Sequence, residues 1–347
     1  MFGPFGVGDS LRIYRLQCKG ISLNLQRGLT EPHAPLRDAW LAFLTQQAMG
    51  QPTYVLYDPH DGEAFIQIHH RPHQAAADVV YLAPSLVEER RAANAWLRLL
   101  DGACIEAAAR GIQRVFANLP GSGAEVDAFH QAGFTLYAGE DIYRLSQSLT
   151  NESQGGSLAL RLLHPEDWPA TQKLCVAIMP QRVRQAEGGI AIATGRGRNC
   201  RSYVLPGSSG DDLAAALTIC SGKLAHWLRL LVHPDAQHAA DGSPTQPSEA
   251  LIRWGLAMLA DQPAKPVYCN VRQYESGVRS GLEAAGFELY ATRALMAKHT
   301  IAWIKTPAQE IVPALKSSAE PVPPAYRIHG EPDFQTPHGR LAAKRDA

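Results

Sequence analysis

A seven-residue segment occurs twice in the chain, and this repeat limits the available folds more than any other feature of the sequence. Residues 132–138 spell Ala-Gly-Phe-Thr-Leu-Tyr-Ala, and residues 285–291 spell Ala-Gly-Phe-Glu-Leu-Tyr-Ala. Six of the seven positions are shared, at an offset of 285 − 132 = 153 residues. Solenoid repeats recur every ~20–50 residues, whereas a whole domain has ~100–150 residues. The sequence therefore predicts one fold used twice.

The segments that precede the two copies also match, in the same order. Val115–Asn118 corresponds to Val267–Asn270, and the apolar run Val79–Pro84 corresponds to Leu228–Pro234, which also ends in proline. Between these matched segments, each half has apolar residues at helical spacing. A collinear match of four elements indicates a duplication rather than a chance similarity of one heptapeptide.

Length and composition suit two folded domains. The chain has 347 residues, 46% of them hydrophobic and 19% charged, which is typical of globular proteins. Residues 146–157 are polar and aperiodic, as linkers are, and residues 306–347 hold seven prolines without periodicity. We predict an N-terminal domain over 1–145, a linker over 146–157, a C-terminal domain over 158–305 that unfolds cooperatively alone, and a disordered tail over 306–347.

Charge and hydropathy narrow the partners and the location. Lys+Arg and Asp+Glu both number 33, so the formal net charge is zero, which disfavours a nucleic-acid surface built on bulk charge. No run approaches 18 uncharged apolar residues, and Met1–Arg15 lacks the layout of a signal peptide. We expect a cytoplasmic protein without nucleic-acid or membrane partners, whose oligomeric state stays open.

The six cysteines form no C-x-x-C pair, and several lie in apolar runs. They are Cys18, Cys104, Cys175, Cys200, Cys220 and Cys269. We expect scattered buried thiols rather than disulfides or a zinc site.

Local patterns predict the secondary structure of the first half. Leu11–Leu25 alternates apolar and polar residues, which favours a strand, and Leu36–Ala48 has an apolar helical face. Three strands should follow as an antiparallel meander, ending with Asp78–Leu82. The half should close with a hairpin over Phe134–Leu145, and the second half with two strands that end at Ile304.

The order of meander, strand-helix-strand-helix, Gly-Phe and final strands resembles the GNAT acyltransferase fold. The two Ala-Gly-Phe-x-x-Tyr elements carry the resemblance, since Gly-Phe opens the sixth strand of that fold, and Pro165-Glu166-Asp167-Trp168 is similar to a common GNAT opening. The resemblance covers about 11–145 and 158–304. It implies an α/β (α+β) protein with two tandem GNAT-like folds, each a mixed, mostly antiparallel sheet flanked by helices.

The resemblance implies an N-acyltransferase that moves an acetyl or other acyl group from acyl-CoA to the amine of a small molecule or peptide. In such a mechanism a backbone N–H of the fourth strand polarises the thioester carbonyl. The matching positions are Leu82 and Ala83 in the first half and Leu231 and Val232 in the second.

The cofactor loops depart from the family pattern. GNAT enzymes bind the pyrophosphate with a glycine-rich loop and a helix N-terminus, but the loop at 84–93 has no glycine. Arg90 and Arg91 would have to bind phosphate through their side chains. The loop at 234–248 has one glycine and an insertion. We therefore expect at most one active half, and Arg90, Arg91 and the shorter loop favour the first.

The catalytic candidates are equally sparse. A fourth-strand carboxylate often serves as base in the family, and Asp78 matches it in the first half. Leu228 stands there in the second half, with His226 two residues earlier on the same face. Asp78 could instead be a turn residue and His226 a half-buried strand histidine. The tyrosine that often acts as acid is replaced by Phe129 and Leu282.

The histidine-rich segment 69–73 could suggest a metal site. His69-His70-Arg71-Pro72-His73 brings three imidazoles together, and imidazoles bind zinc, but no Cys, Asp or Glu lies close by in sequence. We predict no metal site.

Three functions therefore stay open. The first is acyl transfer, with Asp78 or His226 as base. The second is a catalytically degenerate module that binds a small ligand or a partner, which the lost glycines and tyrosines favour. The third is an aminoacyl-type transferase, against which the zero net charge counts.

Overall fold

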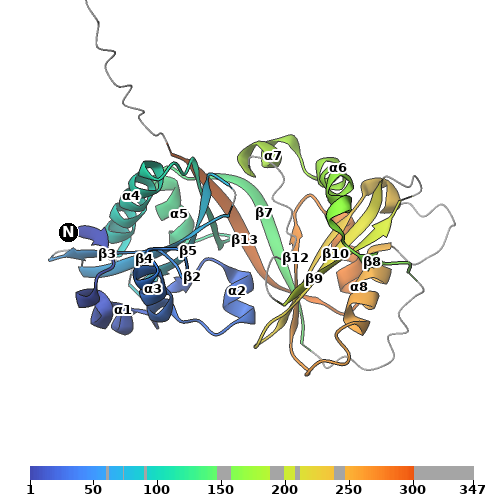
Figure 1. Cartoon of the computed structure of the whole chain (residues 1–347), viewed down its shortest axis with the longest axis horizontal. Helices are drawn as coiled ribbons and strands as arrows, with labels where there is room; N and C mark the ends of the chain where they lie inside the picture. Colours follow the sequence, from blue (N-terminus) through green and yellow to red (C-terminus); the bar gives the residue numbers. More distant parts are fainter. Residues whose placement is uncertain are drawn as a thin grey trace, which may run out of the picture. The chain divides into compact units, whose positions relative to one another are not determined.

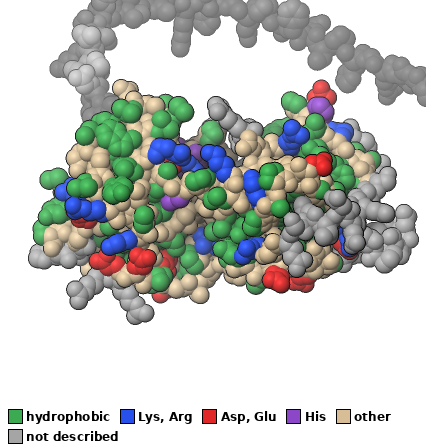
Figure 2. All heavy atoms as spheres, turned by 90° about the horizontal axis from the view of Figure 1, so that it is seen from below, with side chains coloured by type: hydrophobic (Ala, Val, Ile, Leu, Met, Phe, Trp, Pro, Cys, Tyr) green, Lys and Arg blue, Asp and Glu red, His purple; other side chains and the backbone are tan. Residues whose placement is uncertain are grey.

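One mixed sheet with helices on its faces makes up the described part of the chain (Figure 1). The structure is a computed structural model that describes residues 1–59, 62–72, 74–89, 92–146, 158–187, 199–207, 212–237 and 247–300. All of these residues fall within a single compact unit. No helix among them is long and apolar enough to span a membrane. On the face shown in Figure 2, basic, acidic and apolar side chains are interspersed.

The two halves of the chain, residues 1–146 and 158–300, contain similar elements in the same order. The first half comprises β1 (Phe2–Pro4), η1 (Val7–Asp9), α1 (Ser10–Leu16), β2 (Ile21–Ser22), α2 (Leu25–Thr30), α3 (Pro35–Leu44), β3 (Thr53–Asp58), β4 (Gly62–His70), β5 (Ala76–Ala83), α4 (Ala93–Ala109), β6 (Arg114–Pro120), α5 (Ala124–Gln131) and β7 (Thr135–Leu145). The second half comprises β8 (Arg161–Leu162), η3 (Pro165–Asp167), α6 (Trp168–Ile178), α7 (Gln181–Glu187), β9 (Cys200–Pro206), β10 (Leu213–Ser221), β11 (His226–Val232), η4 (Pro234–Gln237), α8 (Pro247–Ala257), β12 (Val267–Arg272), α9 (Ser276–Ala284) and β13 (Glu288–His299).

The last strand of each half lies in the sheet of the other half. The strand order is β1-β3-β4-β5-β6-β13-β7-β12-β11-β10-β9-β8, so β13 lies between β6 and β7, and β7 lies between β13 and β12. The long strands β7 and β13 cross the middle of Figure 1 side by side. The sheet thus runs continuously across the predicted domain boundary. That boundary stays a prediction, because the tail and all of the linker except Ser146 lie outside the described residues.

The repeated heptapeptide encodes a helix end followed by a bulged strand. Gly133 and Gly286 both have φ = +83° directly after a helix, a conformation that glycine adopts without steric cost. In the β7–β13 ladder the register shifts at Tyr137 and at Tyr290, and neither tyrosine has a partner across it. A bulge redirects the side chain of the extra residue. The repeat therefore sets where each tyrosine points.

Helix α2 of the first half docks on the second half. Leu25 and Leu29 pack in an apolar cluster with residues of β11 and β12. The end of the helix meets the β10–β11 turn, where Leu224 N donates to Thr30 O at 2.9 Å. A Cβ on Gly222 would overlap Thr30 O. This turn therefore needs glycine for the close approach.

Helix α7 of the second half docks reciprocally on the first. Its Val183 is fully buried against Ala138 and Leu295. At the 153-residue offset these two positions correspond to Ala291 and Ile142, which belong to the cluster under α2. The halves therefore exchange a helix as well as a strand, at matching places.

Three local predictions are wrong. Leu11–Leu25 contains helix α1 rather than a strand, because Ile13 is fully buried on one helical face while Leu11 is 57% exposed. Phe134–Leu145 is one strand, β7, rather than a hairpin. Gly139 makes no turn there, and its missing side chain leaves room for Gln273, which a Cβ would overlap. The two closing strands of the second half are likewise one strand, β13.

The expectation of free thiols is also wrong for one pair. Cys200 and Cys220 lie directly opposite each other in β9 and β10 and form a disulfide. Their separation of 20 residues carries no signal of this pairing, since the register of the hairpin alone brings them together. Cys104, Cys175 and Cys269 are buried free thiols as expected, whereas Cys18 is exposed.

Candidate functional site

In the first half a wedge opens between β5 and β6, and the chain itself fills it. The two strands run parallel only along Ala76–Val79 and then separate. Beyond that point β2 pairs with β5, with Ile21 opposite Leu82 and with Leu23 N donating to Val80 O at 2.9 Å. Strand β4 pairs with the other edge of β5 at the same residues. Strand β2 therefore occupies the edge that β6 has left.

Specific contacts hold this segment in the wedge. The Tyr81 hydroxyl donates to Gln17 O at 2.6 Å, and Ser85 N donates to Lys19 O at 2.7 Å. A Cβ on Gly20 would overlap the Tyr81 ring. Glycine is thus the residue that lets the backbone lie against this tyrosine.

The matching wedge of the second half has a free strand edge. Strands β11 and β12 pair only along His226–Arg229. His233 N donates to Ala214 O at 2.8 Å, and hydrogen-bonded positions alternate along an antiparallel pair. Leu230 and Val232 therefore direct their N–H and C=O groups away from β10. Leu230 adjoins the last β11–β12 pair, Arg229–Asn270, and Val232 lies beyond it, in the wedge. No described strand pairs with Val232 there.

The length of one connection explains this difference. From α1 to α2 the chain has eight residues, 17–24, and these include β2. From α6 to α7 it has two, Met179 and Pro180. Two extended residues span only about 7 Å, and proline has no N–H for a ladder. The second half therefore cannot fill its wedge in the same way.

An ion pair closes the narrow end of the second-half wedge instead. Both guanidinium NH2 groups of Arg229 donate to Glu275, each at 2.6 Å, and Nη1 also donates to Asn270 O at 3.1 Å. Burial opposes the charge on Arg229, but the Glu275 carboxylate holds the pKa of Arg229 above its usual value. The pair joins β11 to the end of β12 where their ladder stops.

A polar cavity of about 220 Å³ lies on the sheet between the two wedges. Both halves line it, and we call it the central cavity. Its charged and hydroxyl-bearing side chains are Arg71, Asp78, Tyr137, Glu140 and Arg272.

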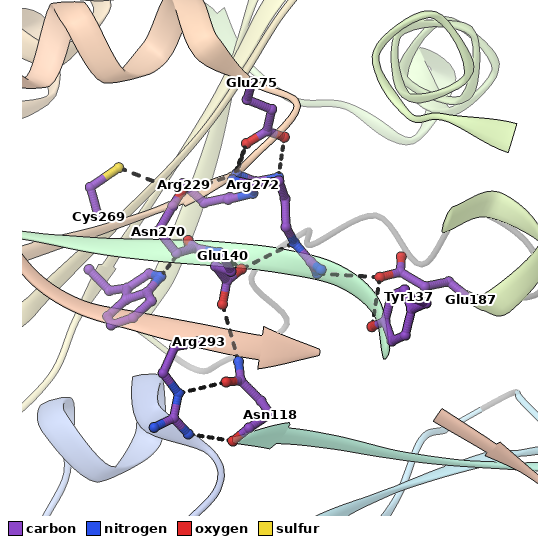
Figure 3. Close-up of polar contacts among 11 residues, drawn as sticks. Asn118, Tyr137, Glu140, Glu187, Arg229, Cys269, Asn270, Arg272, Glu275 and Arg293 are labelled. Carbon is purple, nitrogen blue, oxygen red and sulfur yellow. Dashed lines mark hydrogen bonds and ion pairs between the residues drawn. The ribbon is translucent and has the colours of Figure 1, made fainter. Parts of the chain in front are cut away.

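Glu140 of β7 occupies the middle of this polar network (Figure 3). Its Oε2 accepts a hydrogen bond from Asn118 at 3.1 Å, and its Oε1 accepts one from Asn270 at 2.8 Å. Arg272 Nε lies 3.1 Å from the same Oε1. Asn118 and Asn270 are the matching residues of the two Val-x-x-Asn segments. A buried carboxylate thus uses one amide from each half.

Arg293 stands at the position that matches Glu140 and carries the opposite charge. The two residues are Cα partners across the β7–β13 ladder, at an offset of 153. Arg293 Nε donates to Asn118 Oδ1 at 2.7 Å, and its Nη2 donates to Asn118 O. Burial lowers the pKa of Arg293 to about 10. Asn118 therefore links the two matched positions.

Helix α7 places its last residue, Glu187, against two side chains that line the central cavity. The hydroxyl of Tyr137 donates to Glu187 Oε1 at 3.2 Å, and Arg272 lies 3.3 Å from the same oxygen. Burial raises the pKa of Tyr137. The bulge at Tyr137 and the exchanged helix together build this contact.

Asp78 lies in the central cavity, but Arg71 binds it. Arg71 Nε and Nη2 donate to the two carboxylate oxygens at 2.8 and 2.7 Å, and the guanidinium stacks on Phe116 at 4.1 Å. Asp78 faces Phe116 in the parallel ladder, as Trp227 faces Tyr268. The residue that matches Asp78 is therefore Trp227 rather than Leu228.

The other catalytic candidate lies elsewhere. His226 is 2% exposed at the start of β11, and its Nε2 lies 3.4 Å from Pro263 O beside a separate cavity of about 50 Å³. Burial lowers the pKa of His226. The structure does not bring Asp78 and His226 together.

The cofactor candidates fall into three groups. Leu82 and Ala83 are fully buried. Strand β5 is paired on both sides at Leu82, with β2 on one side and β4 on the other, so Leu82 has no free N–H. Leu231 and Val232 lie at the open end of β11. Arg90 and Arg91 lie outside the described residues, as does His73. Within the described ranges no three His, Cys, Asp or Glu side chains are placed to hold a metal.

Sequence reasoning missed Glu140 and Arg272, although one signal was available. Asn118 and Asn270 end the two matched Val-x-x-Asn segments, and Glu140 and Arg293 follow the repeat at the same distance. The two asparagines, and the opposite charges of Glu140 and Arg293 at matched positions, could have indicated a polar cluster shared by both halves.

Solved structures show the same architecture. A GCN5-related N-acetyltransferase from Sphaerobacter thermophilus matches with a TM-score of 0.54 at 14% identity, over 86% of this chain and 95% of that one. A tandem GNAT protein from the clavulanic acid biosynthesis pathway matches with a TM-score of 0.50 at 15% identity, over 87% of this chain and 98% of that one. The predicted GNAT-like α/β fold is confirmed. No family model matches the sequence, and the search of curated proteins finds no match.

Proposed function

We propose that this chain is an acyltransferase that takes its acyl group from acyl-CoA, with the donor in the second-half wedge and the acceptor amine in the central cavity. The observation that carries the proposal is the free edge at Val232. The corresponding edge of β5 is already paired with β2. The donor site expected from sequence in the first half therefore moves to the second.

The residues of the second half suit an extended donor arm. Free N–H and C=O groups of an exposed edge bind an extended chain as a further strand would. Acyl-CoA would supply an activated thioester, and the wedge-facing N–H of Val232 would polarise its carbonyl. Asn270 connects the two places, because its backbone oxygen lies at the narrow end of the wedge and its side chain lines the central cavity.

The test is amide hydrogen exchange of the full chain with and without acetyl-CoA, resolved to single residues. We expect slower exchange at Val232 and no change at Leu82. Protection at Leu82 would place the donor in the first half, and no protection in either wedge would refute acyl-CoA binding.

A proline variant tests the same edge. Val232→Pro removes an N–H that no described strand uses, so the chain should stay folded while acetyl-CoA binding weakens about tenfold or more. Leu82→Pro is the matched variant, and it should lower stability because that N–H faces β2. Unchanged acetyl-CoA binding by a folded Val232→Pro variant would contradict the proposal.

A binding module without catalysis is the second candidate. It is favoured by the Arg229–Glu275 pair at the narrow end of the wedge and by the arginine or amide partners of both carboxylates in the central cavity. It predicts that acetyl-CoA protects neither wedge, while small polar molecules still bind in the central cavity.

A further inference from the structure

We infer that the central cavity binds a small α-amino acid, whose carboxylate and ammonium groups are held by Arg71 and Asp78. Binding itself is independent of acyl transfer, whereas the role of that molecule as acceptor rests on the proposed function.

Asp78 is the accessible carboxylate of the polar network. Its side chain is 29% exposed and that of Arg71 is 23% exposed. The side chains of Glu140 and Glu187 are only 5% and 9% exposed. A ligand entering the central cavity therefore meets the Arg71–Asp78 pair before the buried glutamates.

Arg71 keeps unused hydrogen-bond donors, and Asp78 keeps unused hydrogen-bond acceptors. Arg71 binds Asp78 through Nε and Nη2, which leaves both N–H bonds of Nη1 and the second N–H of Nη2. Each oxygen of Asp78 accepts one of these bonds and retains a further lone pair. A donor edge thus lies beside an acceptor edge. An α-amino acid carries a carboxylate and an ammonium on one carbon and complements both, whereas a simple amine would leave Arg71 unmatched.

The pair is also fixed before a ligand arrives. The guanidinium of Arg71 lies over the Phe116 ring at 4.1 Å, and Arg71 N donates to Ala76 O at 2.9 Å. A planar guanidinium held between a ring and a carboxylate loses little freedom when it binds a second carboxylate.

Size and charge limit the class of ligand. The cavity of about 220 Å³ is small, which suits a small amino acid and not a folded peptide or a nucleic acid. Arg71 and Arg272 balance Asp78 and Glu140, so the lining is neutral. A neutral lining favours a zwitterion over an ion with net charge.

The experiment is calorimetry on the full chain without acyl-CoA, using L-alanine, L-serine and L-threonine as probes. At least one should bind. For alanine the matched analogues are L-lactate, which lacks the ammonium group, and L-alaninamide, which lacks the carboxylate. Each should bind about tenfold more weakly or worse than the amino acid, as a lost charge-assisted contact implies.

Variants locate the site. Arg71→Gln and Asp78→Asn should each weaken amino-acid binding about tenfold or more. Arg161→Gln is the matched control, because Arg161 and Asp167 form another bidentate pair, with both distances 2.6 Å, away from the central cavity. It should bind as the unaltered chain does.

Two outcomes overturn the inference, and neither needs a variant to fold. One is that none of the three amino acids binds. The other is that alaninamide binds as well as alanine, which would make the ligand a simple amine. Protection of Val232 by acetyl-CoA would still support the proposed function in both cases, so the two failures are distinguishable.

Discussion

The two halves share their order of strands but differ at the wedge beside the fourth strand of each fold. In the first half the eight-residue link 17–24 enters the wedge and pairs with β5. In the second half the link consists of Met179 and Pro180, and the edge of β11 beyond Arg229 has no described strand beside it. A fold can thus be duplicated while one short connection decides which copy keeps an open site.

The centre of the sheet shows a second contrast. Glu140 and Arg293 occupy matched positions and pair across the ladder, yet Glu140 has donors from both halves and Arg293 binds Asn118 alone. Equivalent places in a duplicated fold can therefore carry unequal shares of the stability.

The largest expected effect concerns the exchanged strands. Residues 158–300 lack β7, which lies between β12 and β13, so we expect no cooperative unfolding transition from this fragment alone. This replaces the sequence-based expectation of an independent C-terminal domain. Circular dichroism during heating measures it. As the control, a full chain cleaved at a protease site placed within 147–157 should still melt as one unit. A native-like transition of 158–300 alone would contradict the exchange.

The next largest effect concerns the free energy of unfolding and the oppositely charged residues at matched positions, Glu140 and Arg293. Glu140→Leu leaves Arg272 without one carboxylate partner and two amides without an acceptor, so it should lower the free energy of unfolding by about 3–5 kcal/mol. Arg293→Leu removes contacts to Asn118 alone and should cost about 1–3 kcal/mol. Urea denaturation of both variants compares them. Equal losses would show that the two positions contribute alike.

The filled wedge gives a smaller effect. Gly20→Val should push the chain away from Tyr81 and lower stability by about 1–3 kcal/mol, with faster amide exchange at Leu82. Gly8→Val is the matched control, because a Cβ there meets nothing within 4 Å. If Leu82 exchanges as slowly in Gly20→Val as in the unaltered chain, β2 does not depend on this glycine.

The smallest effect concerns the 3-10 helices near the start of each half, η1 and η3. Asp167 caps η3 by accepting from His164 N, as Asp9 does for Gly6 N in η1. The Arg161 hydrogen bonds lower the pKa of Asp167 from 3.8 to about 2. Because the folded pKa lies below the unfolded value, this stabilisation is complete above pH ~4 and is lost as the pH falls toward ~2.

Asp167→Asn should accordingly flatten the decline of stability between pH ~4 and ~2. Urea midpoints measured across this range test it, with Asp9→Asn as the comparison. A decline as steep as that of the unaltered chain would mean that other carboxyl groups cause it.

The sequence predicted some residues of the candidate site and missed others. Asp78 was found and does line the central cavity, but its partner Arg71 was treated as part of a histidine cluster. Glu140 was missed because a lone glutamate in a strand has no signature, and its donors Asn118 and Asn270 lie 22 and 130 residues away. His226 was proposed from spacing alone, and burial at the start of β11 removes it from the cavity.

The sequence by itself determined the repeat, the order of the matched segments and the helix ends at Gly133 and Gly286, because these depend on local patterns and on backbone conformations that glycine adopts. Tertiary structure alone decided which half each copy of the last strand joins. Strands β7 and β13 both begin in a copy of the repeated heptapeptide, and local sequence does not distinguish pairing within a half from pairing across to the other half. The exchange of β7 and β13 in turn brought Asn118, Glu140 and Asn270 together, and the packing of residues 17–24 against Tyr81 decided which wedge stays open.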